Sequence, residues 1–259
     1  MLKKSKLKQK YLNKELVTQT MLRFPDPGAA EIMVLSGVDV VIIDQEHYPF
    51  NIEQIERIVR AVQSFGGECM VRVQNSEPTR IALTMETGIS GVLIPHVETY
   101  EEAMTVVNAV KYAPVGTRGF CPITRAAAYG MRMSPSEYAA FANENTSIIL
   151  MAETKKGLEN LDKILTIPEV DGIAIGPSDV SASYGFPGQP EHPIVKAAID
   201  GGARKVIESG KCLSALGYTP EAAELAWKMG ARQMNVGSDV QMLSTFKNLI
   251  NSVAQVCTK

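Results

Sequence analysis

Short apolar runs alternate with amphipathic segments along nearly the whole chain. The clearest run, residues 38–44 (VDVVIID), is rich in β-branched residues and has the length of a buried parallel strand. Between the runs, apolar residues recur at helical spacing, as they do across residues 52–62. The strands predicted in this way are 16–22, 38–44, 68–74, 90–97, 147–153, 170–178, 211–217 and 232–238.

Capping signals support helices between these strands. Thr99 and Glu102 form the pattern of a capping box, and Thr219 before Pro220 is an N-cap followed by a proline in the first turn. Eight strand–helix pairs predict an α/β fold, a (β/α)8 TIM barrel formed by one domain, residues 1–259. We expect an N-terminal helix lying on the barrel. An open doubly wound sheet is less favoured, because no GxGxxG follows a strand.

Composition narrows the function. The net charge of −2 and the pI of about 6.0 argue against nucleic acid or an anionic membrane as partner. No apolar run approaches the ~18 residues of a membrane span, and the lysine-rich N-terminus has no following apolar segment of a secretory signal. The cysteines lack CxxC or zinc-type spacing, which favours reduced thiols and a cytoplasmic protein; they are Cys69, Cys121, Cys212 and Cys257.

Polar residues gather where the predicted strands end, which is the face on which barrel enzymes carry their sites. They are Asp44, Glu46, His47, Arg72, His96, Glu153 and Asp179. Glu153 and Asp179 end neighbouring strands, so their carboxylates are predicted to converge on a divalent cation, Mg²⁺ or Mn²⁺, with Co²⁺ also acceptable. The alternative is that each acid only caps the helix that follows it.

His47 is a candidate general base, because its ordinary pKa suits proton transfer near neutrality, and Asp44 is a candidate to orient it. Arg72 lies between two valines, and a buried guanidinium needs an anion. That anion is either a developing enolate or a core carboxylate. His96 and His192 are interpreted as structural.

Two glycine-containing segments are candidates for binding. Gly176 and Pro177, with Ser178 after them, let backbone amides approach a ligand closely. Residues 114–134 form a long segment that carries Arg118 and Arg125, and long loops in compact domains are usually functional. The alternative is that this segment covers the barrel edge or contacts another subunit.

The motifs IIDQEH, MVRV, GVLIPHVET, ETKKGLENLD and DGIAIGPSDVSAS, in this order across residues 30–240, resemble those of the HpcH/HpaI aldolases. The resemblance implies a metal-dependent enzyme that cleaves 4-hydroxy-2-oxo acids to pyruvate and an aldehyde. It also implies a homo-oligomer, a hexamer, whose last helix is exchanged between subunits.

Carried over residue by residue, the resemblance makes Glu153 and Asp179 the metal ligands. It makes His47 the base, acting through a metal-bound water with Asp44 as partner, and Arg72 the group that holds the C2 oxygen. Glu86 matches an aspartate that reaches a neighbouring subunit's site. The expected substrate-binding residues are Gly176, Pro177, Ser178, Arg125, Glu86, Met151 and Leu216.

Met151 departs from the family pattern, which often has glutamine there. Methionine cannot donate an amide hydrogen bond to a pyruvyl group. Oxaloacetate decarboxylation, another enolate-forming lyase reaction, or non-catalytic binding of an oxo acid therefore remain alternatives.

Overall fold

Eight parallel strands close into a barrel in which each strand pairs with its sequence neighbour and β1 pairs with β8. The structure, a computed structural model, describes residues 2–257. Closure confirms the predicted (β/α)8 architecture and rules out the open sheet. The strands are β1 Val17–Leu22, β2 Val40–Asp44, β3 Glu68–Arg72, β4 Gly91–Ile94, β5 Ser147–Met151, β6 Gly172–Ala174, β7 Cys212–Leu216 and β8 Gln233–Ser238.

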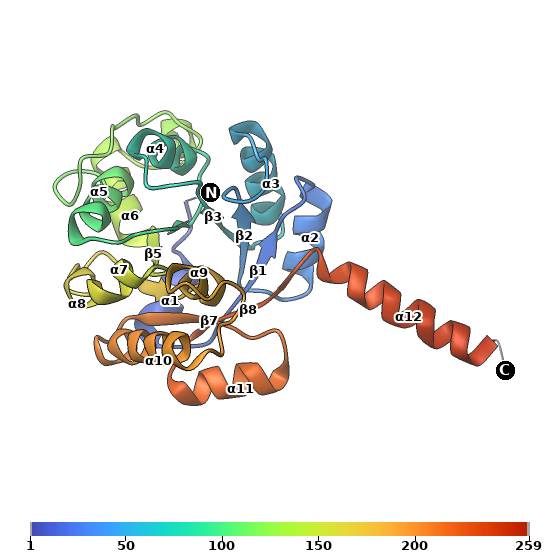
Figure 1. The fold of residues 1–259 in the computed structure, drawn as a ribbon. Helices are drawn as coiled ribbons and strands as arrows, with labels where there is room; N and C mark the ends of the chain where they lie inside the picture. The colour runs from blue at the N-terminus through green and yellow to red at the C-terminus, as the bar shows by residue number, and fades with distance from the viewer. Residues whose placement is uncertain (1, 258–259) are drawn as a thin grey trace.

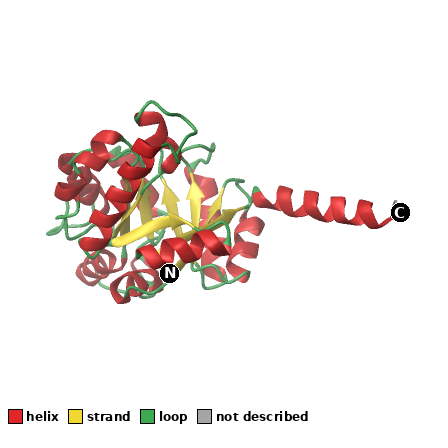
Figure 2. Ribbon diagram, turned by 60° about the horizontal axis from the view of Figure 1, so that its bottom comes forward, coloured by secondary structure: helices red, strands yellow, loops and turns green. Residues whose placement is uncertain are grey.

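Helices surround the strands, as Figure 2 shows. The capping box at Thr99 and the N-cap at Thr219 form as predicted. The helices are α1 Lys6–Asn13, α2 Pro27–Leu35, α3 Ile52–Ser64, α4 Pro78–Glu86, α5 Tyr100–Val110, α6 Pro135–Asn145, α7 Lys155–Glu159, α8 Leu161–Ile164, α9 Pro177–Ser183, α10 Pro193–Glu208, α11 Pro220–Met229 and α12 Gln241–Cys257, with the 3₁₀ turn η1 Ala128–Gly130.

Alternate residues of each strand face opposite sides of the barrel wall. Ile42 belongs to the cluster inside the barrel, whereas Val41 and Ile43 belong to the larger cluster between strands and helices. Helix α1 lies at the N-terminal end of the barrel, where Leu7 joins the inner cluster and is 1% exposed. Helix α1 thus closes the N-terminal end of the barrel interior. The open end for a ligand is the C-terminal end of the strands.

Helix α12 projects away from the barrel (Figure 1). None of its residues is buried, although it carries large apolar side chains such as Phe246 and Ile250. Among the described residues, no helix is long and apolar enough to cross a membrane. A membrane-spanning helix therefore does not explain the exposed apolar side chains of α12.

Candidate active site at the C-terminal end of the barrel

Asp44 and Arg72 form the centre of the site. They are the last residues of β2 and β3 and stand opposite each other in the strand register. Arg72 donates from Nε to Asp44 Oδ1 at 2.9 Å and from Nη2 to Oδ2 at 2.7 Å, and the Asp44 side chain is fully buried. Burial alone would lower the pKa of the Arg72 guanidinium, but Asp44, followed by Glu46 and Glu153, raises it. Arg72 therefore stays a fixed positive charge.

Glu46 links this pair to two histidines. Its Oε2 lies 3.0 Å from Arg72 Nη1 and 3.4 Å from His47 Nε2, and its Oε1 lies 3.3 Å from His96 Nε2. Asp44 was expected to orient His47, but it meets only the backbone amide of that residue, at 3.4 Å. The group beside the His47 ring is therefore Glu46, and the ring itself is more than half exposed.

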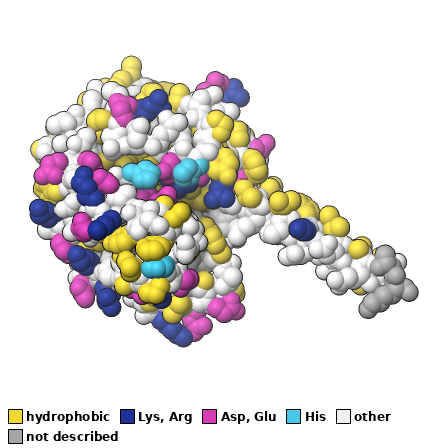
Figure 3. All heavy atoms as spheres, in the orientation of Figure 1, with side chains coloured by type: hydrophobic (Ala, Val, Ile, Leu, Met, Phe, Trp, Pro, Cys, Tyr) yellow, Lys and Arg dark blue, Asp and Glu magenta, His cyan; other side chains and the backbone are white. Residues whose placement is uncertain are grey.

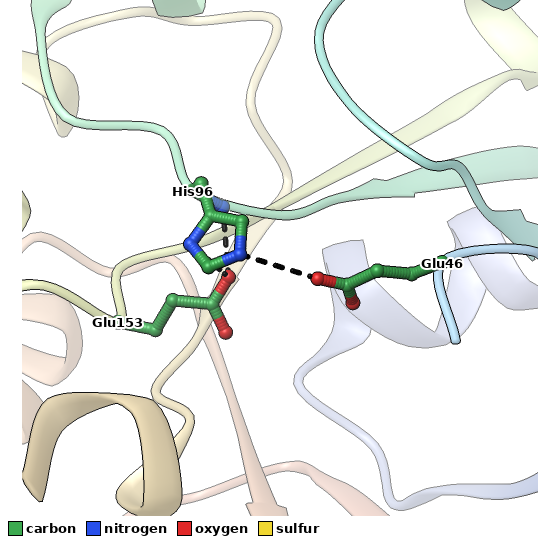
Figure 4. A group of neighbouring side chains, drawn as sticks. All are labelled: Glu46, His96 and Glu153. Atoms are coloured by element: carbon green, nitrogen blue, oxygen red, sulfur yellow. Dashed lines mark hydrogen bonds and ion pairs between the residues drawn. The ribbon is translucent and has the colours of Figure 1, made fainter. Parts of the chain in front are cut away.

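His96 bridges two acids, as Figure 4 shows. Its Nδ1 lies 3.3 Å from Glu153 Oε1, and its backbone amide donates to the same oxygen at 2.8 Å. The backbone of His96 has φ +54°, a left-handed conformation that is unusual for a residue with a side chain. Such conformations are enriched at functional sites, so His96 becomes a candidate functional residue, while its interpretation as structural stays an untested prediction.

Glu153 follows β5 and is almost as buried as Asp44, with 1% of its surface exposed. Burial raises the pKa of its carboxyl; the backbone amide and charge of His96 oppose this, and the charges of Glu46 and Asp179 add to it. The pKa of Glu153 is therefore raised mainly by burial and, to a smaller extent, by the neighbouring acids.

Glu153 and Asp179 converge above Gly176. A Cβ built on Gly176 would lie 2.8 Å from Glu153 Oε2 and 3.5 Å from Asp179 Oδ2. Any side chain there would fill the space that the two carboxylates share. Pro177 and Ser178 begin α9, and Asp179 lies in its first turn. The convergence predicted for Glu153 and Asp179 is therefore present.

Two further predicted binding residues lie at the C-terminal ends of their strands. Met151 ends β5, is 7% exposed and belongs to the inner cluster, next to the site. Leu216 ends β7 and is 44% exposed at the same end of the barrel.

Glu86 and Arg125 are not brought to this site within the chain. Glu86 ends α4, whose C-terminus lies at the opposite end of the barrel, and pairs with the buried Arg118 at 2.5 Å. Arg125 donates to the Thr87 carbonyl and to Gln63 Oε1. Glu86 and Arg125 thus have partners within their own chain, and residues 114–134 pack against α4.

The site holds ligand atoms that suit a divalent cation. One atom each from Glu46, His96 and Glu153 lie within 4.8 Å of one another. Carboxylates with an imidazole fit Mn²⁺ or Co²⁺ as well as Mg²⁺. Sequence reasoning named Glu153 and Asp179 as the only protein ligands and missed this group, although Glu46 and His96 both follow predicted strands. On the molecular surface, acidic and histidine side chains gather near the middle of one face (Figure 3).

A cluster of charged side chains at the C-terminal face of a closed (β/α)8 barrel is the arrangement of a barrel enzyme. The family model "HpcH/HpaI aldolase/citrate lyase" matches residues 22–245, and the chain belongs to this family. Its family and relatives make it a carbon–carbon lyase.

Individual relatives agree with this assignment. The chain is 34% identical to a 2-dehydro-3,6-dideoxy-6-sulfogluconate aldolase of Pseudomonas putida, over 88% of this chain and 89% of the relative. It is 36% identical to a 2-keto-3-deoxy-L-rhamnonate aldolase of Escherichia coli K12, over 83% and 80%. A solved HpcH/HpaI family structure from Burkholderia cenocepacia J2315 matches with a TM-score of 0.91 and 28% identity, covering 96% of this chain and 99% of the other.

Proposed function

We propose that the protein is a metal-dependent aldolase that cleaves or forms 4-hydroxy-2-oxo acids through a pyruvate enolate. The observation that carries the proposal is the buried Glu153, which converges with Asp179 and His96 beside the fixed charge of Arg72. Relatives named as keto-deoxy-rhamnonate and hydroxypyruvate/pyruvate aldolases support a 2-oxo acid as the substrate class.

Glu153 and Asp179 are the proposed metal ligands, and Glu46 and His96 are positioned to add to them. A divalent cation held there supplies Lewis acidity at the C2 carbonyl. Because Glu153 is buried with its carboxylate close to those of Glu46 and Asp179, a divalent cation suits this position.

Arg72 has donors left for a substrate. Its Nε, Nη1 and Nη2 each contact Asp44 or Glu46, but each Nη carries two hydrogens, so one N–H on each remains. We propose that one of these N–H groups donates a hydrogen bond to the C2 oxygen. This hydrogen bond strengthens as negative charge develops on the oxygen. The bidentate bond to Asp44 holds the guanidinium plane in position for this.

His47 is the proposed base for the C4 hydroxyl. Its Nε2 faces Glu46, a carboxylate that can stabilise the imidazolium formed when the ring takes the proton. The ring is more than half exposed, so it can also return the proton to solvent after the C3–C4 bond has broken.

Met151 supports a second candidate. It lines the inner wall beside the site and offers no hydrogen-bond donor to a pyruvyl group. A weaker hold on pyruvyl groups suits decarboxylation of oxaloacetate, which uses the same enolate, or binding of an oxo acid without turnover.

Assembly is the remaining part of the proposal. The projecting α12 presents apolar side chains at helical spacing, and α2 and α11 expose others. In a (β/α)8 barrel the last helix belongs between the first and the penultimate, and here α12 leaves that position. We propose that α12 packs between α2 and α11 of a second copy, in a homohexamer. The exposed apolar residues of α12 are Met242, Leu243, Phe246, Leu249, Ile250, Val253 and Val256.

Pyruvate proton exchange tests the function directly. An enolate former exchanges the C3 protons of pyruvate in D₂O, which NMR detects, and EDTA should stop the exchange while Mn²⁺ restores it. Exchange together with cleavage of an aldol substrate supports the aldolase. Exchange with turnover of oxaloacetate alone supports the decarboxylase, and no exchange in the presence of metal supports the binding protein.

A further inference from the structure

Arg23 places a second guanidinium at the C-terminal end of the barrel. It directly follows β1, and its neighbour Leu22 stands opposite Ile43 in the register, which brings Arg23 level with Asp44. The backbone there is held firmly, because the amides of Arg23 and Phe24 donate to Asp239 Oδ2 at 2.8 and 2.7 Å. Asp239 is itself 3% exposed, so the direction of the Arg23 side chain is set by a buried anchor.

The guanidinium of Arg23 lies among side chains that orient it and bind it only weakly. Its Cζ sits 5.7 Å from the centre of the Tyr48 ring, and its Nη1 donates to Ser238 Oγ at 3.3 Å. Its Nε is buried and makes no hydrogen bond. The Arg23 side chain as a whole is 28% exposed.

Pairing with Asp44 does not account for Arg23. Arg23 Nε lies 3.8 Å from Asp44 Oδ2, beyond hydrogen-bond distance. Arg72 already donates to both oxygens of Asp44 at 2.7–2.9 Å. Among the described residues, the only hydrogen-bond partner of the Arg23 guanidinium is Ser238 Oγ, at long distance, and a guanidinium bound this weakly favours an anionic partner.

The position of Arg23 defines what that anion belongs to. The proposed metal ligands follow β5 and β6, and β1 stands across the barrel mouth from them. In the proposed binding mode, a cation at Glu153 and Asp179 would hold the carboxylate and keto oxygens of the 2-oxo acid, with the distal carbons directed across the mouth toward β1. Arg23 therefore lies where the far end of the substrate, the aldehyde half, arrives.

We propose that Arg23, supported by Tyr48 and Ser238, binds an anionic group at the distal end of the substrate. The substrate class is then a 4-hydroxy-2-oxo acid with a second acidic group, so that the aldehyde product carries a carboxylate, sulfonate or phosphate. This inference rests on the proposed aldolase function and adds its specificity.

Matched aldehydes test the inference in the condensation direction with pyruvate and Mn²⁺. The pairs are succinic semialdehyde against butanal for a carboxylate, sulfoacetaldehyde against 3,3-dimethylbutanal for a sulfonate, and glyceraldehyde 3-phosphate against glyceraldehyde for a phosphate. The quantity measured is the ratio of kcat/KM for the charged aldehyde to that for its neutral match. A general loss of activity or folding lowers both values and leaves this ratio unchanged.

In the wild-type protein we expect one charged aldehyde to be favoured, and Arg23→Gln should lower that ratio by roughly ten- to a hundredfold, as expected for loss of a charge-assisted hydrogen bond. Arg23→Lys should restore part of the ratio, because it keeps the charge. Arg57→Gln on α3, an exposed arginine paired with Glu53, is the control and should leave the ratio at the wild-type value.

Two failures are distinguishable. Wild-type protein that turns over aldehydes with the same ratio as Arg23→Gln overturns the inference and leaves the aldolase in place. Wild-type protein that neither exchanges pyruvate protons nor condenses any aldehyde overturns the proposed function itself, and the inference with it.

Discussion

Arg72→Lys separates a catalytic arginine from a structural one. Arg72 is bound to the fully buried Asp44 through two nitrogens and lies 3.0 Å from Glu46 through a third, and its side chain is 12% exposed. Lysine keeps the positive charge, but one ammonium group cannot contact both oxygens of Asp44, Glu46 and a substrate oxygen at the same time.

Both stability and rate are expected to fall, for different reasons. Losing one charge-assisted hydrogen bond to a buried carboxylate costs about 1.5–3 kcal/mol of unfolding free energy, or a Tm lower by about 3–10 °C. If Arg72 also stabilises the enolate oxygen, kcat should fall by about 10²–10³, as for the loss of one oxyanion donor.

The control is an ion pair of similar burial at the other end of the barrel. Lys8 and Asp171 lie 2.5 Å apart with side chains 16% and 9% exposed. Lys8→Gln should lower Tm to a similar extent and leave kcat near the wild-type value. The measurement is kcat and Tm for the three proteins, each from one preparation. Equal falls in Tm with kcat unchanged in both variants would show that Arg72 is only a structural partner of Asp44.

Three further predictions follow from other parts of the molecule. Glu153→Gln should weaken Mn²⁺ binding, measured by calorimetry, by at least about tenfold. The control is Glu159→Gln at an exposed position of α7, which should leave the affinity unchanged. Unchanged affinity in Glu153→Gln excludes Glu153 as a ligand. Phe246→Glu with Ile250→Glu should dissociate the oligomer in sedimentation, with Lys247→Gln as the control; a wild-type protein that sediments as an active monomer at micromolar concentration contradicts the exchanged helix. For Asp39, burial would raise the pKa, but hydrogen bonds from Lys10 and Thr18 lower it. The unfolded chain then binds more protons, so this stabilisation is present above about pH 4 and is lost as the pH falls; Asp39→Asn should lower Tm at pH 7 more than at pH 3, and equal shifts at both contradict it.

The sequence alone determined the barrel and which residues reach its C-terminal end. Short, nearly continuous apolar runs mark the strands, and the residue that follows such a run must lie at the strand end. Asp44 and Arg72 could therefore be placed side by side, because consecutive strands of a barrel are neighbours. Glu153 and Asp179 could be placed together for the same reason.

Only the tertiary structure decided which polar atoms meet. Two acids, Asp44 and Glu46, lie at the end of β2, and side-chain rotamers rather than sequence spacing select Glu46 as the neighbour of the His47 ring. The left-handed backbone of His96 depends on a hydrogen bond to Glu153, 57 residues away, and local patterns carry no sign of it.

Contacts between distant parts of the chain explain the remaining differences between the sequence-based predictions and the structure. Glu86 and Arg118 form an ion pair because the segment after α5 folds back on α4. No motif in the sequence indicates this pairing. Arg23 gains its place beside Tyr48 and Ser238 only when β1 pairs with β8, the first strand with the last. Strand patterns report local burial, whereas the contacts of a closed barrel join residues more than two hundred positions apart, and these contacts arise only from folding of the whole chain.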